Sequence, residues 1–253
     1  MRTSRLASRL ASIVLALALP VGAMAQQLTV SAAASLTDAF KEIGTKFEAS
    51  KPGATVRFNF AASGVLLQQI SQGAPVDVFA SADQETMDRA ANQKLVDTAT
   101  RKDFATNSLV LIEPTQGGAG LKTLQDLTGP NVKKIAVGKT ATVPVGRYTR
   151  EALEAAKLWA PLEPRFVQAD SVRQVLDYVS RGEAEAGFVY RTDAAVMGDK
   201  VRVVLTATGH TPVSYPIAVT AESKEKALAK DFIAFLSTEQ AQAVLVRFGF
   251  GKP

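Results

Sequence analysis

The sequence predicts an α/β protein of two lobes, each a mostly parallel sheet flanked by helices, with a ligand cleft between the lobes. Strand-like runs alternate with helical patterns through almost the whole chain, which is typical of parallel sheets covered on both faces. The alternation stops at the glycine-rich stretch 114–120 and then starts again. A late strand-like run, 215–219, is placed to return to the first half.

The first half of the chain contains three strand-like runs, each followed by a helical pattern. The runs are residues 28–31, 55–60 and 76–80. Apolar residues at helical spacing after the first run are Leu36, Phe40, Ile43 and Phe47. They predict one buried helix face. The second helix is expected to open at Ser63 and end near Gly73, and the third to begin with a capping box, Ser81-Ala82-Asp83-Gln84.

The second half repeats the alternation after the glycine-rich stretch. Its strand-like runs are residues 109–112, 135–138, 187–190 and 201–205. Helices are expected at residues 147–157, 227–236 and 238–248. A further helix is expected to begin with Asp170 as its cap and to bury Val172, Val175, Leu176 and Val179. The order predicts a second α/β unit that resembles the first in its organisation.

Two such units, together with a late strand that can return to the first, describe two lobes joined by two crossover segments, which we expect around Asn107-Ser108 and around Ser214-Tyr215. Lobe I then comprises residues 26–107 together with 216–253, and lobe II comprises 108–215. Ligands of open α/β sheets lie beyond the carboxyl ends of the strands, so the loops of both lobes are expected to converge on the cleft.

The N-terminus has the pattern of a secretory signal peptide. Three arginines precede an apolar run, residues 10–21, and an Ala-x-Ala sequence that ends at Ala25. The run is too short to remain as a membrane anchor, since a spanning helix needs roughly 20 residues. We expect cleavage after Ala25, so that residues 1–25 are the signal peptide and the mature chain is periplasmic.

Composition argues against several classes of protein. The formal charge is +5. Without the three arginines of the expected signal peptide, the chain has 26 basic and 24 acidic residues. Lysine and arginine are dispersed, and no basic stripe interleaved with aromatics suggests nucleic-acid binding. The chain has no cysteine. Disulfides, thiolate metal sites and a lipidated cysteine are therefore excluded.

Two strand-to-helix turns carry a serine where a helical pattern begins, Ser35 in Ala32-Ala33-Ala34-Ser35 and Ser63 after Phe60-Ala61-Ala62. A helix N-terminus directs free backbone N–H groups and the positive end of the helix dipole to one point, and a serine adds a hydroxyl donor. Two such turns indicate a small-anion site. The alternative is that each serine only caps its own helix.

A secreted hydrolase is the competing class, with Ser63 as nucleophile. Such a serine needs a base within reach, and the only histidine, His210, lies in a predicted loop. A Gly-x-Ser-x-Gly elbow is absent. Asp77, Asp83 and Asp193 are more consistent with capping and surface roles than with a metal or carboxylate cluster. We therefore expect no catalytic residues.

Six motifs occur in an order and spacing that resemble a known family. They are Ala32-Ala33-Ala34-Ser35-Leu36-Thr37, the segment Gly73 to Asp83, Asn107-Ser108-Leu109-Val110, Ala136-Val137-Gly138, Val143-Pro144-Val145-Gly146 and Arg247-Phe248-Gly249-Phe250. Together they resemble the periplasmic molybdate-binding proteins of ABC transporters, over essentially the whole mature chain. The resemblance implies the two-lobed periplasmic-binding-protein fold.

The resemblance also implies the ligand set. Ser35 and Ser63 would bind the oxyanion from lobe I through hydroxyl and backbone N–H groups. From lobe II, Val145 and Val172 would contribute backbone N–H groups and Tyr190 its hydroxyl. Family members often carry alanine at the position of Val145, but that contact is made by the main chain. The molybdenum would have no direct protein ligand, because the anion is held through its oxygens.

As function, the resemblance implies a receptor, not an enzyme, that captures molybdate and also tungstate and delivers the anion to an inner-membrane ABC permease. It further implies a monomer that needs no cofactor. The alternative within the same superfamily is a receptor for another tetrahedral oxyanion such as sulfate.

Overall fold

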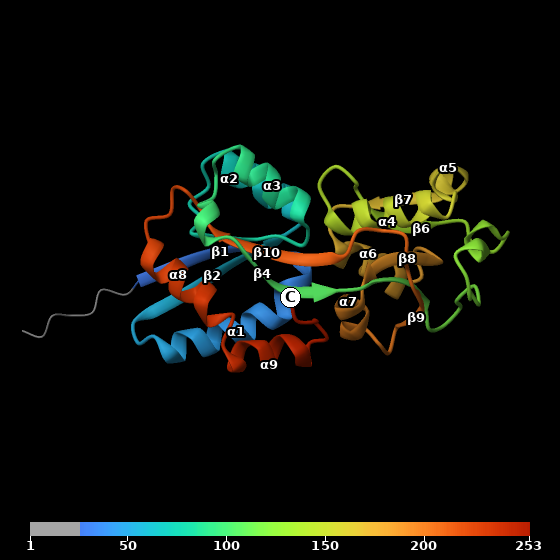
Figure 1. Ribbon diagram of the computed structural model, residues 1–253. Coiled ribbons are helices and arrows are strands. Elements are labelled where there is room, and N and C mark those ends of the chain that lie inside the picture. Colours follow the sequence, from blue (N-terminus) through green and yellow to red (C-terminus); the bar gives the residue numbers. More distant parts are fainter. Residues whose placement is uncertain (1–25) are drawn as a thin grey trace, which may run out of the picture.

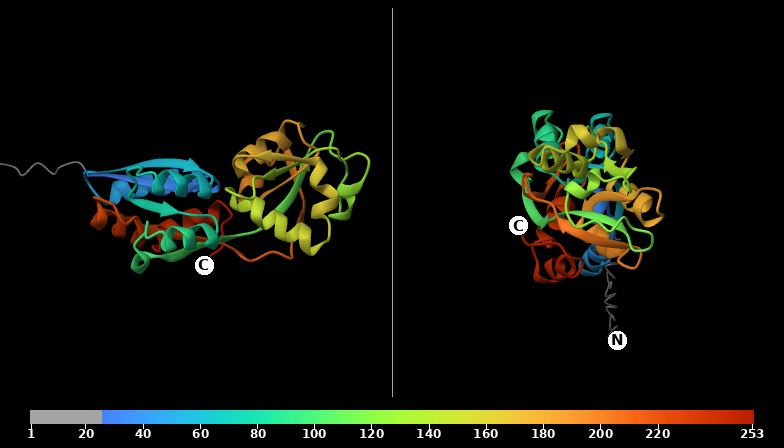
Figure 2. Two further views of the ribbon diagram at one scale, coloured as in Figure 1. Left: turned by 90° about the horizontal axis from the view of Figure 1, so that it is seen from above. Right: turned by 90° about the vertical axis from the view of Figure 1, so that its right-hand side faces the viewer.

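The computed structural model describes residues 26–253, so the expected signal peptide lies outside the described residues. The chain forms two lobes, each with one five-stranded sheet and helices packed against it (Figure 1). Figure 2 shows the lobes lying end to end, with two chain segments passing between them. No helix within residues 26–253 is both long and apolar enough to cross a membrane.

The first lobe combines the beginning of the described chain with its end. Its elements are β1 (Gln26–Ala33), a 3-10 turn (Ala34–Leu36), α1 (Thr37–Ser50), β2 (Ala54–Ala61), α2 (Ser63–Ser71), β3 (Val78–Ala80), α3 (Gln84–Asn92), a 3-10 turn (Thr98–Thr100), β4 (Lys102–Asn107), β10 (Val213–Val219), α8 (Lys226–Phe235) and α9 (Glu239–Arg247). The strand order is β2-β1-β3-β10-β4. Helices α2 and α3 cover one face of this sheet, and α1, α8 and α9 lie on the other (Figure 1).

The second lobe is formed by the intervening residues. Its elements are β5 (Leu109–Pro114), a 3-10 turn (Gln125–Thr128), β6 (Ile135–Gly138), α4 (Pro144–Ala155), α5 (Trp159–Leu162), a 3-10 turn (Glu163–Arg165), β7 (Phe166–Ala169), α6 (Val172–Ser180), β8 (Ala186–Tyr190), α7 (Arg191–Val196) and β9 (Val201–Thr206). The strand order is β7-β6-β8-β5-β9.

The two-lobed α/β prediction is confirmed, and both sheets are mixed. Strand β10 is antiparallel to β3 and β4, and β5 is antiparallel to β8 and β9. These are the two strands that bring the chain in from the opposite lobe. Strands β5 and β10 therefore run away from the cleft, whereas the strands on either side of each run toward it.

The connections between the lobes are short. β4 ends at Asn107 and β5 begins at Leu109, so the first connection is at Ser108. The second spans residues 207–212, between β9 and β10. Ser214 and Tyr215, where we expected this crossover, pair with Thr106 and Ala105 in the first sheet. Strand β4 itself was not predicted, because its sequence is largely polar and it lies at the sheet edge.

The apolar positions expected on α1 are buried and form the core under that helix. Phe40 and Phe47 both pack against Phe232 of α8, with ring centroids 6.0 and 5.2 Å apart. On the other face of the sheet, Phe79 of β3 packs among residues of α2 and α3, including Met87. Packing on both faces holds the start of α2, and with it Ser63, at the edge that faces the second lobe.

Two expected helix caps were wrong by one or two residues. The N-cap of α3 is Asp83, whose carboxylate accepts from the backbone N–H of Thr86 at 3.1 Å. Ser81 is still hydrogen-bonded to the sheet, because its N–H donates to the carbonyl of Pro216 in β10. The N-cap of α6 is Ser171, and Asp170 instead pairs with a surface lysine. In each case the chain stays extended beyond the residue we expected to cap.

Candidate oxyanion-binding site

The five residues expected to bind an anion meet in one pocket between the lobes. Its cavity volume is only about 10 Å³, and its lining consists of Ala33, Ala34, Ser35, Ala62, Ser63 and Ala82 from the first lobe and Val143, Pro144, Val145, Val172 and Tyr190 from the second. All of these side chains are uncharged. Sites for drug-sized ligands are larger, about 300–1,000 Å³. The pocket is therefore suited to a small ligand that both lobes contact.

The two serines come from the turns that the sequence indicated, but neither caps its helix. Ser63 is the first residue of α2, and its Oγ accepts from the backbone N–H of Ala82 at 3.0 Å. Ser35 lies in the 3-10 turn before α1, with its Oγ 3.0 Å from the hydroxyl of Tyr215. The capping alternative is therefore wrong for both serines.

The neighbours of the two serines leave their hydroxyl protons free. The hydroxyl of Tyr215, which is fully buried, accepts from the side-chain amide of Asn107 at 3.1 Å. Burial raises the pKa of Tyr215, so the phenol keeps its proton and can donate it to Ser35 Oγ, 3.0 Å away. When Tyr215 donates in this way, Ser35 accepts one hydrogen bond, as Ser63 does from Ala82, and each serine can donate its own proton to a ligand.

Tyr190 supplies a third hydroxyl, at the end of β8. The side chain is buried, and its Oη has no hydrogen-bond partner among the described residues. Burial raises the pKa of Tyr190 well above its ordinary value, so the group stays a neutral donor. A buried hydroxyl without a partner is costly. A bound acceptor in the pocket would relieve that cost.

The main chain adds donors at the starts of two helices. Val172 is the first residue of α6 and Val145 the second of α4, so their N–H groups have no acceptor within their own helices. The start of α4 is tightly placed, because Gly146 packs on the backbone of Gly138 with no room for a Cβ. Both helix N-termini place partial positive charge at the pocket.

Three further residues contribute to the site without a signal in the sequence. Ala82, Asn107 and Tyr215 orient the serine hydroxyls, although none was expected at the site. Alanine acts here through its main chain, and Tyr215 was expected in a crossover, so sequence patterns contained no signal for either. The result is a pocket whose side chains offer hydroxyl donors and no carboxylate acceptor.

A catalytic arrangement around Ser63 is not supported by the neighbouring groups. His210 lies in the second connection between the lobes, where its Nε2 is 3.2 Å from the carbonyl of Ala207, and it is not among the pocket residues. The polar partner of Ser63 is a backbone N–H and not a base. Within residues 26–253, no three histidine, aspartate or glutamate side chains gather as metal ligands.

A buried acid lies in α7, three residues after Tyr190. Asp193 of α7 is fully buried, not on the surface as expected, and its carboxylate is 2.6 Å from Nε of Arg173, although this contact is not aligned as a hydrogen bond. Arg173 also reaches Asp38 of α1 at 2.8 Å, across the cleft. Burial raises the pKa of Asp193 to about 6, and the charge of Arg173 opposes part of this increase.

The raised pKa of Asp193 gives stability a defined pH dependence. Between about pH 4 and 6 the folded chain retains a proton that the unfolded chain has lost, so the contribution of this group to stability falls as pH rises. Replacing Asp193 with Asn removes the effect. From pH 4 to 7, we expect the unfolding free energy of the wild type, relative to Asp193→Asn, to fall on the order of 2 kcal/mol in urea denaturation. Parallel pH profiles would contradict this assignment.

The fold and the site define a solute-binding protein of two lobes. The model of the family described as bacterial extracellular solute-binding protein matches residues 28–251, and the chain belongs to this family. Among its relatives, molybdate-binding protein ModA of Escherichia coli (strain K12) is 41% identical over 229 residues, which cover 88% of each chain. ModA of Haemophilus influenzae is 35% identical and covers 90% of this chain and 91% of its own.

Solved structures of molybdate-related binding proteins are similar to this chain as well. The substrate-binding domain of a putative molybdenum ABC transporter from Clostridium difficile is 39% identical, with a TM-score of 0.69 over 90% of this chain and 99% of that one. The periplasmic molybdate-binding protein of Azotobacter vinelandii is 26% identical, with a TM-score of 0.77 over 89% and 99%. The sulfate-binding protein SubI of Mycobacterium tuberculosis is 18% identical with a TM-score of 0.78, which shows a shared fold alone.

Proposed function

We propose that this chain is a periplasmic receptor that captures molybdate, and also tungstate, and delivers the anion to an inner-membrane ABC permease. The observation that carries the proposal is the pocket between the lobes, where Ser35, Ser63 and Tyr190 present hydroxyl donors and two helix N-termini present N–H groups. Relatives named for molybdate binding support the choice of anion.

The chemistry of the pocket favours a fully ionised dianion. Hydrogen bonds to a charged acceptor contribute roughly 1.5–3 kcal/mol each, so a set of five to seven supports tight binding without a salt bridge. Molybdate, tungstate and sulfate need only donors. Phosphate carries a proton near neutral pH and needs an acceptor, which the lining side chains do not offer. We therefore infer selection by protonation and size.

The same proposal assigns the chain no catalytic activity and no cofactor. The anion would be held through its oxygens by Ser35, Ser63, Val145, Val172 and Tyr190, without a protein ligand on the metal. The chain would be exported by its leader, cleaved after Ala25 and function as a monomer. Closure of the lobes around the anion would create the surface that the permease recognises.

Competition between oxyanions tests the function. Micromolar molybdate should raise the midpoint of thermal unfolding, because it binds only the folded chain. Tungstate should displace molybdate in calorimetry, whereas excess sulfate should not, since its shorter bonds leave the hydrogen bonds stretched. Phosphate is the matched negative control. Easy displacement by sulfate would identify a sulfate receptor, and a chain stabilised by an amino acid but not by molybdate would overturn the proposal.

A further inference from the structure

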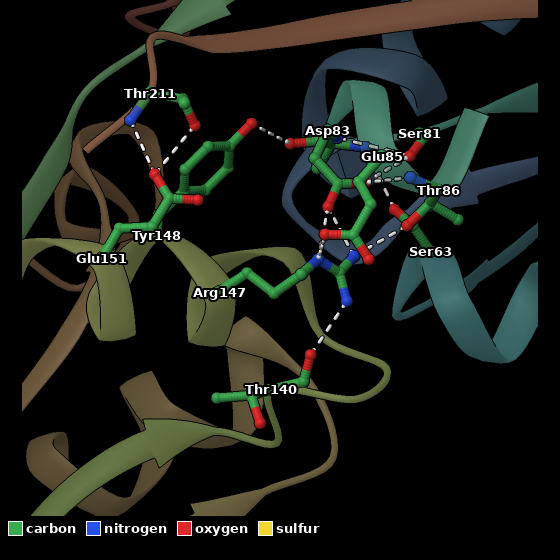
Figure 3. Close-up of polar contacts among 11 residues, drawn as sticks. Ser63, Ser81, Asp83, Glu85, Thr86, Thr140, Arg147, Tyr148, Glu151 and Thr211 are labelled. Atoms are coloured by element: carbon green, nitrogen blue, oxygen red, sulfur yellow. Dashed lines mark hydrogen bonds and ion pairs between the residues drawn. The ribbon is translucent and has the colours of Figure 1, made fainter. Parts of the chain in front are cut away.

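A buried arginine joins the two lobes beside the pocket. Arg147 of α4 points its guanidinium across the cleft to Asp83, the N-cap of α3 (Figure 3). Its Nε donates to Asp83 Oδ2 at 2.8 Å, and its Nη2 donates to the same oxygen and, at 2.7 Å, to Thr86 Oγ1. The side chain of Arg147 is 12% exposed and that of Asp83 is 5% exposed. The pair is therefore largely removed from water.

The guanidinium is also anchored in its own lobe. Its Nη1 donates to the carbonyl of Thr140 at 3.0 Å, in the loop that leads into α4 (Figure 3). Each of its three nitrogens thus has a protein acceptor, and Arg147 is not among the residues that line the pocket. The cation is therefore fully occupied by protein acceptors and lies outside the lining of the pocket.

The partners of Arg147 lie next to the anion donors in the sequence. Asp83 follows Ala82, whose N–H holds Ser63 Oγ, and Arg147 is two residues from Val145. A second contact between the lobes, from Gly64 N–H to the carbonyl of Thr142 at 2.9 Å, lies in the same region. Contacts that join the lobes here also set the positions of donors from both lobes.

We propose that Arg147 and Asp83 form an interlobe latch that stabilises the closed conformation and positions the donors around Ser63 and Val145. The proposal rests on the proposed function. The latch forms only when the lobes meet, because Arg147 lies in the second lobe, whereas Asp83 and the more exposed Glu85, 3.4 Å from Arg147 Nε, lie in the first. An anion that needs both lobes is then bound more tightly by a chain with the latch, although the latch never contacts the anion.

Long-range attraction of the dianion by Arg147 is the competing explanation, and Asp83 separates the two. If charge alone mattered, removing the negative charge of Asp83 would tighten binding. If the latch matters, Asp83→Asn weakens binding as Arg147→Gln does. Asparagine is a good N-cap residue, so this variant retains the cap on α3. The two explanations therefore predict opposite signs for one substitution.

A double-mutant cycle measured by calorimetry with molybdate tests the latch. We expect Arg147→Gln and Asp83→Asn each to raise Kd at least roughly tenfold, the loss of a charge-assisted contact. The double variant should be no weaker than Arg147→Gln, because the second change removes a charge already left without its partner. The affinity for tungstate should fall by the same factor in each variant. Tighter binding by Asp83→Asn, or additive losses, would overturn the latch.

The matched control is Arg150→Gln on the same helix. Arg150 is exposed and pairs with Glu154 within α4, so its removal leaves the cleft unchanged and Kd should equal that of the wild type. X-ray scattering without anion gives a second readout, in which Arg147→Gln should have a larger radius of gyration than Arg150→Gln. Equal radii together with equal Kd values exclude the latch. Failure of the wild type to bind molybdate instead overturns the proposed function, and scattering still tests the latch.

Discussion

Replacing Gly64 with alanine should weaken molybdate binding by roughly 30- to 1,000-fold, equivalent to about 2 to 4 kcal/mol. A Cβ on Gly64 would lie 2.7 Å from both the Cα and the carbonyl oxygen of Thr142, across the cleft. Both atoms belong to the main chain, so trimming the Thr142 side chain cannot relieve the overlap. The lobes would be held apart, and the hydrogen bond from Gly64 N–H to Thr142 would be lost.

The control for this prediction is another glycine with space around it. A Cβ on Gly198 meets nothing closer than the Ala195 carbonyl at 3.8 Å, so Gly198→Ala should bind molybdate as the wild type does. Thermal unfolding without anion should show that Gly64→Ala is still folded, since the overlap lies between the lobes and not within one. Wild-type affinity in Gly64→Ala would mean that binding does not require the closed arrangement.

Removing a pocket hydroxyl should be the next largest effect. Ser35→Ala, Ser63→Ala and Tyr190→Phe each delete one donor and leave an oxyanion oxygen unpaired, which costs about 1.5–3 kcal/mol, or roughly tenfold to a hundredfold in Kd. Ser35→Ala and Ser63→Ala should be more severe than Tyr190→Phe, because they also remove the hydrogen-bond partner of the Tyr215 hydroxyl and of the Ala82 N–H, respectively. Calorimetry with molybdate at neutral pH measures all three.

Ser223→Ala is the matched control for the hydroxyl series. Ser223 is also a buried serine, but its Oγ donates to Asp77 at 2.7 Å, away from the pocket residues. We expect it to lower stability and leave Kd unchanged. If the three pocket variants bind as tightly as the wild type, the assigned ligand set is wrong even if the chain binds molybdate.

Most of the fold could be predicted because local patterns matched the tertiary environment. Phe40 and Phe47 recur at helical spacing and both pack against the same core. Strand β4 was missed because its polar edge sequence shows no apolar alternation, and β10 was expected to begin at Tyr215 and not at Val213. Two helices begin later than expected, because Asp83 and Ser171, and not Ser81 and Asp170, accept from the free N–H groups at their starts.

The class of site could be predicted from the sequence. Serine hydroxyls and the free N–H groups at strand-to-helix turns supply hydrogen-bond donors, and these donors are a property of residue type and of local helix geometry. Tertiary structure decided which donors are free and what holds the lobes together. The hydrogen-bond partner of Ser35 is Tyr215, 180 residues away in sequence, and Arg147 meets Asp83 only across the cleft. Such contacts depend on how two lobes pack against each other, and no local pattern encodes that packing.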